Sequence, residues 1–88
     1  MKEMHFTRHA LDQMADRGAS IDEAKLAVEQ GEFVEARLGR RAYRKNFSFH
    51  AVWKKKFYQW KQVMPIIVEE KARLVVITVY VFYFGGNQ

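Results

Sequence analysis

The sequence predicts an α+β domain in which two N-terminal helices pack on a twisted antiparallel β-sheet of about four strands. Apolar residues recur at helical spacing up to Gly31, and beyond it they alternate with polar residues at a period of two. Helices followed by a run of strands are typical of α+β folds. A chain of 88 residues is expected to form one domain, residues 1–88.

The first helix is predicted at about residues 7–17. Thr7 is a good N-cap, and Phe6 and Leu11 stand where a hydrophobic staple places its two apolar residues. Gly18 suits the end of this helix because glycine adopts the left-handed conformation that closes many helices.

The second helix is predicted at about residues 20–30. Ser20 and Glu23 have the spacing of a capping box, in which each side chain binds the other residue's backbone N–H. Gly31 marks its end.

The strands are predicted within about residues 32–84. Period-two alternation favours strands over about 32–37, 40–55, 61–69 and 73–84, with a hairpin connection at 69–72. The last strand is expected to be the longest and central. Pro65 argues that the third of these strands lies at a sheet edge or on a bulge, because proline donates no hydrogen bond to a sheet ladder.

Composition excludes several classes of protein. The chain has no cysteine, which excludes disulfides and cysteine metal sites and favours a reducing, cytoplasmic compartment. No apolar stretch suits a membrane helix, and the N-terminus does not resemble a signal peptide. Its three histidines are dispersed and no phosphate-binding glycine loop is present, so neither a metal nor a cofactor is expected.

The charge is distributed unevenly along the chain. Residues 1–35 hold eight Asp or Glu, whereas residues 36–68 hold none and carry nine Lys or Arg. Such a stretch suits a polyanion, RNA first and an acidic protein second, although a solvated surface would look the same. The candidate RNA contacts are Arg40, Arg41, Arg44, Lys45, Lys54, Lys55, Lys56 and Lys61.

Two residues of the first helix stand out for chemistry. At about 100° per residue, Arg17 falls within the apolar arc of the helix, so its guanidinium must be held by a partner or face a polar pocket. His9, in the first turn, is a plausible proton-transfer group near neutral pH. The alternative is that His9 is a surface histidine and that Arg17 braces the turn between the helices.

Two residues of the last strand could act with them. Thr78 and Tyr80 are two positions apart, so in a regular strand they share a face, opposite Val75, Ile77, Val79 and Val81. Both residue types are common in strands, and a purely structural role is the alternative. The sequence leaves open which sheet face the helices cover. If they cover the valine face, His9 and Arg17 must reach Thr78 and Tyr80 around a sheet edge.

Several segments resemble the bacterial domain family of unknown function DUF4258. They are Thr7-Arg8-His9-Ala10, Gln13-Met14, Asp16-Arg17-Gly18-Ala19-Ser20 with Asp22-Glu23-Ala24, and the late strand Val76-Ile77-Thr78-Val79-Tyr80. The resemblance spans about residues 6–31 and 73–81. That family looks related to the barnase, EndoU, colicin and RelE-like ribonuclease folds, which include BrnT-type toxins. The resemblance therefore implies a RelE/barnase-like fold.

The same resemblance implies a toxin that cleaves RNA without a metal ion. By analogy with toxins of that superfamily, the catalytic residues would be His9, Arg17, Thr78 and Tyr80. His9 would transfer the proton, Arg17 would hold the phosphate, and Thr78 would orient it. Tyr80 would donate to the leaving oxygen or stack on a base.

Two other functions fit the same residues. One is a non-catalytic binding module that uses the basic stretch to hold RNA or an acidic partner, such as a cognate antitoxin or immunity protein. The other is an interaction domain that meets a protein through exposed aromatic residues: Phe57, Tyr58, Trp60, Phe82 and Phe84.

Overall fold

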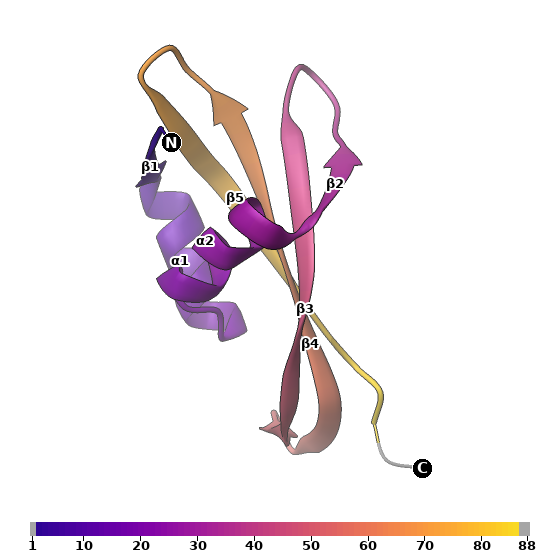
Figure 1. The fold of residues 1–88 in the computed structure, drawn as a ribbon. Helices are drawn as coiled ribbons and strands as arrows, with labels where there is room; N and C mark the ends of the chain where they lie inside the picture. The colour runs from indigo at the N-terminus through magenta and orange to yellow at the C-terminus, as the bar shows by residue number, and fades with distance from the viewer. Residues whose placement is uncertain (1, 87–88) are drawn as a thin grey trace.

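The computed structural model describes residues 2–86 and shows two helices packed on a five-stranded sheet (Figure 1). The strand order is β1-β5-β4-β3-β2, antiparallel except for the parallel pair β1 and β5. The predicted α+β architecture is confirmed, with one strand more than expected. The elements are β1 (Glu3–Phe6), α1 (Arg8–Arg17), α2 (Ile21–Gln30), β2 (Glu32–Glu35), β3 (Arg41–Trp53), β4 (Lys56–Glu69) and β5 (Arg73–Phe84).

Both helices begin and end where their capping residues predict. The Thr7 hydroxyl accepts a hydrogen bond from the Ala10 N–H at 3.1 Å, and Gly18 closes α1 at a φ of 83°. The predicted capping box at the start of α2 has both of its hydrogen bonds, each 3.0 Å long, between Ser20 and Glu23. These signals are local, which is why the sequence locates the helices so closely.

Strand β1 is the element that the sequence analysis missed. Its four residues precede the Thr7 cap and pair in parallel with β5, from Glu3 opposite Arg73 to Phe6 opposite Val76. So short a segment carries little periodicity of its own, and its partner lies about seventy residues away. The pairing ends at Val76, so within residues 2–86 no strand pairs with the outer edge of β5 from Ile77 onward.

Strand β4, not β5, is the central strand and the longest, at 14 residues. Pro65 therefore lies in the interior of the sheet, so of its two predicted positions, a sheet edge or a bulge, the edge is wrong. Its partner on β5 is Val79, and the register between the two strands shifts close by, between Ile66 and Ile67. The interior strand tolerates proline here because the ladder with β3 has a gap between the pairs Ala42–Ile66 and Lys45–Val63, although the register is the same on both sides of the gap.

The hydrophobic core lies between the helices and one face of the sheet. Its buried sheet residues include Val63 and Ile67 from β4 and Val76 and Val79 from β5. The helices contribute Ala10, Met14 and Ala24. Small alanine side chains let the helix backbones approach the sheet closely, and in the described part of the chain no helix covers the other face of the sheet (Figure 1).

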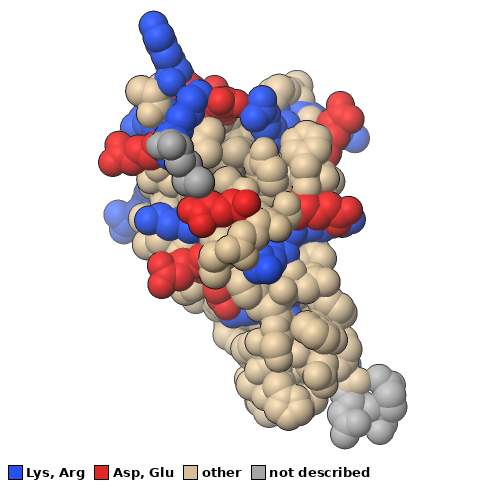
Figure 2. All heavy atoms as spheres, in the orientation of Figure 1, with Lys and Arg blue, Asp and Glu red and all other residues tan. Residues whose placement is uncertain are grey.

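The molecule is elongated, 46 × 24 × 23 Å, because the β3–β4 hairpin and the end of β5 extend past the helices (Figure 1). Figure 2 shows charged side chains gathered around the helices, whereas the extended end is almost uncharged on the face in view. Of the helices within residues 2–86, neither is long and apolar enough to cross a membrane.

Candidate functional site at the edge of β5

The register shift in β5 decides which residues face the helices. Because one extra residue is accommodated between Val76 and Thr78, both Val76 and Val79 lie on the helix-covered face. Thr78 and Tyr80 therefore lie on the open face, opposite Ile66 and Met64 of β4. The four valine and isoleucine residues expected to share one face are split by this shift, which periodicity alone does not reveal.

Helix α1 takes over from β1 as the partner of the β5 edge. The Val79 N–H donates to the side-chain Oε1 of Gln13, and Nη1 of Arg17 donates to the Val79 carbonyl, both at 2.9 Å. Both backbone groups of Val79 therefore point away from β4, as in the non-hydrogen-bonded pairs of an antiparallel ladder. Gln13 and Arg17 of α1 thus hydrogen-bond the two backbone groups of Val79 that lie on the edge of β5.

Arg17 also brings the helix to the open face. Its guanidinium carbon lies 5.6 Å from the centre of the Tyr80 ring, a cation–π distance. The side chain therefore spans the sheet edge from the helix-covered side to the open side. One of its five N–H donors binds Val79, which leaves others to hold an anion beside Tyr80.

His9 lies on the same row of α1 as Gln13 and Arg17, at four-residue spacing, and its side chain is exposed. Eight residues of helix separate the Cα atoms of His9 and Arg17 by about 12 Å along the axis. The structure thus brings Arg17 and Tyr80 into contact, puts Thr78 on the same face as Tyr80, and leaves His9 two turns away.

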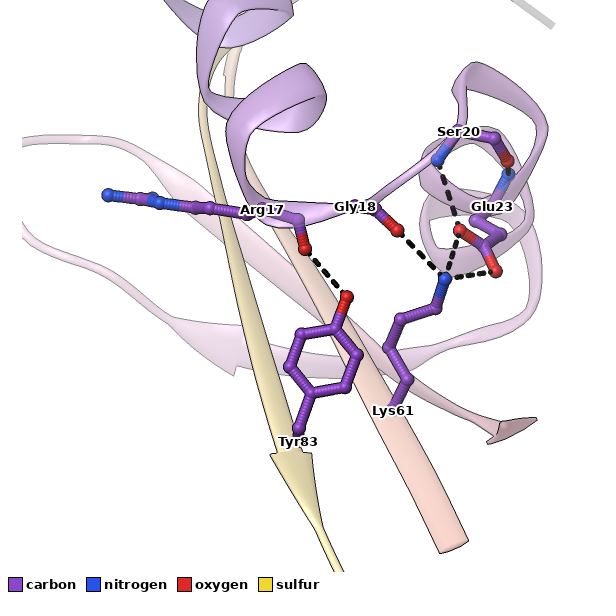
Figure 3. A network of polar contacts seen from close by, with 6 residues as sticks. All are labelled: Arg17, Gly18, Ser20, Glu23, Lys61 and Tyr83. Carbon is purple, nitrogen blue, oxygen red and sulfur yellow. Dashed lines mark hydrogen bonds and ion pairs between the residues drawn. The ribbon is translucent and has the colours of Figure 1, made fainter. Parts of the chain in front are cut away.

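A buried polar network holds the end of α1 (Figure 3). Lys61 is only 7% exposed, and its ammonium group lies 2.9 Å from the Gly18 carbonyl and from both carboxylate oxygens of Glu23. The Tyr83 hydroxyl donates to the Arg17 carbonyl at 2.7 Å. The network fixes the backbone at Arg17 while the Arg17 side chain extends in the opposite direction, toward the β5 edge (Figure 3).

The electrostatics of this network follow from its burial. Burial raises the pKa of the Tyr83 phenol, and the negative charge of Glu23 raises it further, so Tyr83 stays a hydrogen-bond donor. Lys61 was a candidate RNA contact, but its ammonium group faces the turn between the helices. It is therefore left out of the proposed contact surface.

The other basic candidates separate into two groups at opposite ends of β3. Strand β3 has 13 residues, and at about 3.3 Å per residue it spans roughly 40 Å. Arg41 pairs with Glu69 and Arg44 with Glu32, both at 2.8 Å, and these contacts lower the pKa of both carboxyls, with Lys2 as the first cause at Glu69. Sequence proximity made these cations look like one patch because it does not measure the length of an extended strand.

The far end of β3 presents lysines on an unusual turn. Lys54 and Lys55 join Trp53 to Lys56 in a two-residue hairpin, with φ angles of 49° and 74°. Such turns favour Asn-Gly, and a residue with a Cβ costs roughly 1–2 kcal/mol in this conformation. The chain thus keeps two ammonium groups at the hairpin tip where local stability favours other residues.

Several aromatic residues on the open face are exposed, namely Trp60, Tyr80, Phe82 and Phe84. The sequence predicts exposed aromatic side chains at three of these positions, Trp60, Phe82 and Phe84, and also at Phe57 and Tyr58, which the structure shows half-buried. Tyr58 instead contacts the Tyr83 ring, with centroids 5.6 Å apart. Within residues 2–86, no group of three or more His, Asp or Glu side chains is arranged to hold a metal ion.

Comparison with known protein families shows which family this chain belongs to. The family model described as Domain of unknown function (DUF4258) matches residues 6–81. The chain belongs to the DUF4258 family. The match includes both helices and runs through Tyr80, so the β5-edge site lies within the DUF4258 domain. No curated protein and no solved structure matches the chain.

Proposed function

We propose that this DUF4258 domain is a metal-independent endoribonuclease of the toxin class. The observation that carries the proposal is the Arg17 guanidinium, which reaches around the β5 edge onto Tyr80 from the helix row that begins with His9. The excess of basic side chains and the resemblance of the family to RelE- and barnase-like ribonucleases support it. The relation to that superfamily is part of the proposal.

The proposed reaction is attack of an RNA 2′-hydroxyl on the adjacent phosphate. A bond forms between the 2′-oxygen and phosphorus, and the bond from phosphorus to the 5′-oxygen breaks, leaving a 2′,3′-cyclic phosphate and a 5′-hydroxyl. His9 accepts the proton of the 2′-hydroxyl, and Tyr80 donates a proton to the leaving oxygen. Arg17 stabilises the charge that develops on the phosphate, which Thr78 orients.

The mechanism requires that the side chains of His9 and Arg17 both reach the same phosphate. Since His9 and Arg17 lie about 12 Å apart along the helix axis, the reacting phosphate has to sit between them, beside Gln13. The other basic residues, which are exposed or half-buried, would contact the rest of the RNA backbone: Arg40, Arg41, Arg44, Lys45, Lys54, Lys55 and Lys56.

The test is incubation of the protein with end-labelled RNA in EDTA, beside His9→Ala and Arg17→Ala. His5→Ala and Arg8→Ala are matched controls, because both residues are exposed and lie close by in the chain. Cleavage by the parent and the two controls, but not by His9→Ala or Arg17→Ala, would support the catalytic roles of His9 and Arg17 if it leaves 2′,3′-cyclic phosphate ends. Equal cleavage by His9→Ala and the parent would reject this assignment.

The separation of His9 from Arg17 favours a second function, a non-catalytic module that binds RNA or an acidic partner such as an antitoxin. The Arg17–Tyr80 pair and the lysines at the hairpin tip serve such a module without any proton transfer. Retention on RNA that weakens steeply with salt, with no cleavage on free RNA or on RNA bound to ribosomes, would identify this function.

A further inference from the structure

Four aromatic rings stand exposed on the open face of the sheet. Tyr80, Phe82 and Phe84 follow one another along β5 with 41%, 46% and 40% of their surface exposed, and Trp60, opposite Phe84 on β4, is 39% exposed. We call these four residues the aromatic row. Contiguous exposed apolar groups of this kind mark binding surfaces in soluble proteins.

The rings of the aromatic row have the arrangement that base stacking needs. The Tyr80 and Phe82 rings are nearly parallel, at 17°, with centroids 6.3 Å apart. Stacked bases are spaced by about 3.4 Å, so this separation is close to twice that spacing. A flat base can stack on either ring or, with a small opening, between the two, and stacking tolerates any base because each has a π-face.

The charge beside the aromatic row favours an anionic partner, and the exposed flat rings favour one that carries bases. Arg17 places its guanidinium over the Tyr80 ring, at one end of the row. The neighbouring strand positions carry Asn46 and Gln62, whose side chains bind each other at 2.9 Å. Glu32, further across this face, is already paired with Arg44.

We propose that the aromatic row binds the unpaired bases of single-stranded RNA. The bases stack on the exposed rings, and Arg17 holds the phosphate backbone at the Tyr80 end. Bases within a duplex cannot do this, because their faces are covered by their neighbours. The inference that this RNA is a substrate rests on the proposed function, for which the row then specifies single-stranded segments.

Trp60 supplies a direct readout of stacking. The chain has two tryptophans, so Trp53→Phe leaves Trp60 as the sole tryptophan reporter. The probe is a ten-nucleotide 2′-O-methyl RNA, which lacks the attacking hydroxyl, used either alone or annealed to its complement. We expect the single strand to quench Trp60 fluorescence, the duplex to leave it nearly unchanged, and Phe82→Ala to weaken single-strand binding about tenfold.

Phe33→Ala is the matched control, because Phe33 is 55% exposed but contacts Tyr43 on the β2–β3 edge, away from the aromatic row. It should leave the affinity unchanged. Equal binding of single strand and duplex, or no effect of Phe82→Ala, would overturn the proposal. So would a dimer in sedimentation that Phe82→Ala dissociates without altering RNA affinity, since a second copy would then be the occupant.

The probe cannot be cleaved, so this result is independent of the cleavage test in EDTA. If the probe quenches Trp60 but natural RNA is not cleaved, the aromatic row is supported as a base-binding surface and the catalytic assignment is rejected. Cleavage of natural RNA at the same rate by Phe82→Ala and the parent, with no quenching of Trp60, would keep the catalytic assignment and reject the row.

Discussion

The two faces of the sheet both carry large apolar side chains but bury them to different extents. The helix-covered face buries Val63, Ile67, Val76 and Val79 to within about 1% of complete burial. The open face leaves Phe82 and its aromatic neighbours close to half exposed. Burial of apolar surface is the main source of folding stability, so the covered face accounts for the fold.

The lower burial of the aromatic side chains on the open face indicates that this face is the functional one. Exposed rings gain little folding energy from the sheet, and a surface that exists only for stability would carry polar side chains instead. The covered face even contains the buried Lys61–Glu23 pair, which ties the helices to the sheet at the base of the proposed site. The open face has the free rings and Arg17 at its edge.

The largest expected effect comes from the buried ion pair. Glu23→Ala should lower the free energy of unfolding by about 3 kcal/mol, because it leaves the Lys61 charge buried without its partner and removes the capping box. Urea unfolding followed by circular dichroism measures this loss. Glu29→Ala, exposed on the same helix, is the control, and an equal loss in both variants would contradict the role of the pair.

The second prediction compares alanine substitutions of one residue from each face, Val63 and Phe82, in stability and in RNA binding. Val63→Ala should cost about 2 kcal/mol of stability because Val63 is fully buried, whereas Phe82→Ala should cost about 1 kcal/mol or less. Binding of single-stranded RNA should show the reverse order. A Val63→Ala variant that stays folded but loses RNA binding as strongly as Phe82→Ala would remove the distinction between the faces.

The strained hairpin tip offers a substitution that should stabilise the fold and weaken binding together. The double variant Lys54→Asn/Lys55→Gly places residues that favour the left-handed conformation at both turn positions. It should raise the free energy of unfolding by about 1.5 kcal/mol. If both ammonium groups contact phosphates, the slope of log affinity against log salt falls by about 2. An unchanged slope would separate the tip from the RNA interface, with Lys25→Gln on α2 as the control.

The smallest effect concerns Tyr83. Tyr83→Phe removes the hydrogen bond to the Arg17 carbonyl and should cost about 1 kcal/mol near pH 7. The pKa of Tyr83 is raised in the folded protein, so its contribution is fully present below pH 10 and is lost as the pH rises above it. Unfolding measured from pH 7 to 11 should show the parent and variant converging, and a constant difference would contradict this.

Much of the fold could be predicted from the sequence because its signals are local. Thr7, Gly18, Ser20 and Glu23 form their caps within three or four residues, so no knowledge of distant contacts is needed. The alternation after Gly31 likewise indicates strands directly. Strand β1 and the interior position of Pro65 were missed or mispredicted because both depend on pairing with residues far along the chain.

The candidate site was only partly accessible to sequence. The placement of Arg17 in an apolar arc correctly signalled that a partner must hold it, but the partner is the Val79 carbonyl, which no side-chain pattern encodes. The burial of Lys61 was hidden for the same reason, since its charge alone resembles that of the exposed lysines around it.

Local residue patterns are enough to predict the two helices, their ends, the strand periodicity and the excess of positive charge in the middle of the chain. Three features depend on how the chain folds: the face that Thr78 and Tyr80 occupy, the placement of the basic residues at opposite ends of β3, and the open face that four aromatic rings share. The faces of β5 depend on its one-residue register shift, whereas the separation of the basic groups follows from the length of the extended strand β3. A single extra residue reverses the direction of every side chain beyond it, and strand pairing between distant segments sets where it occurs.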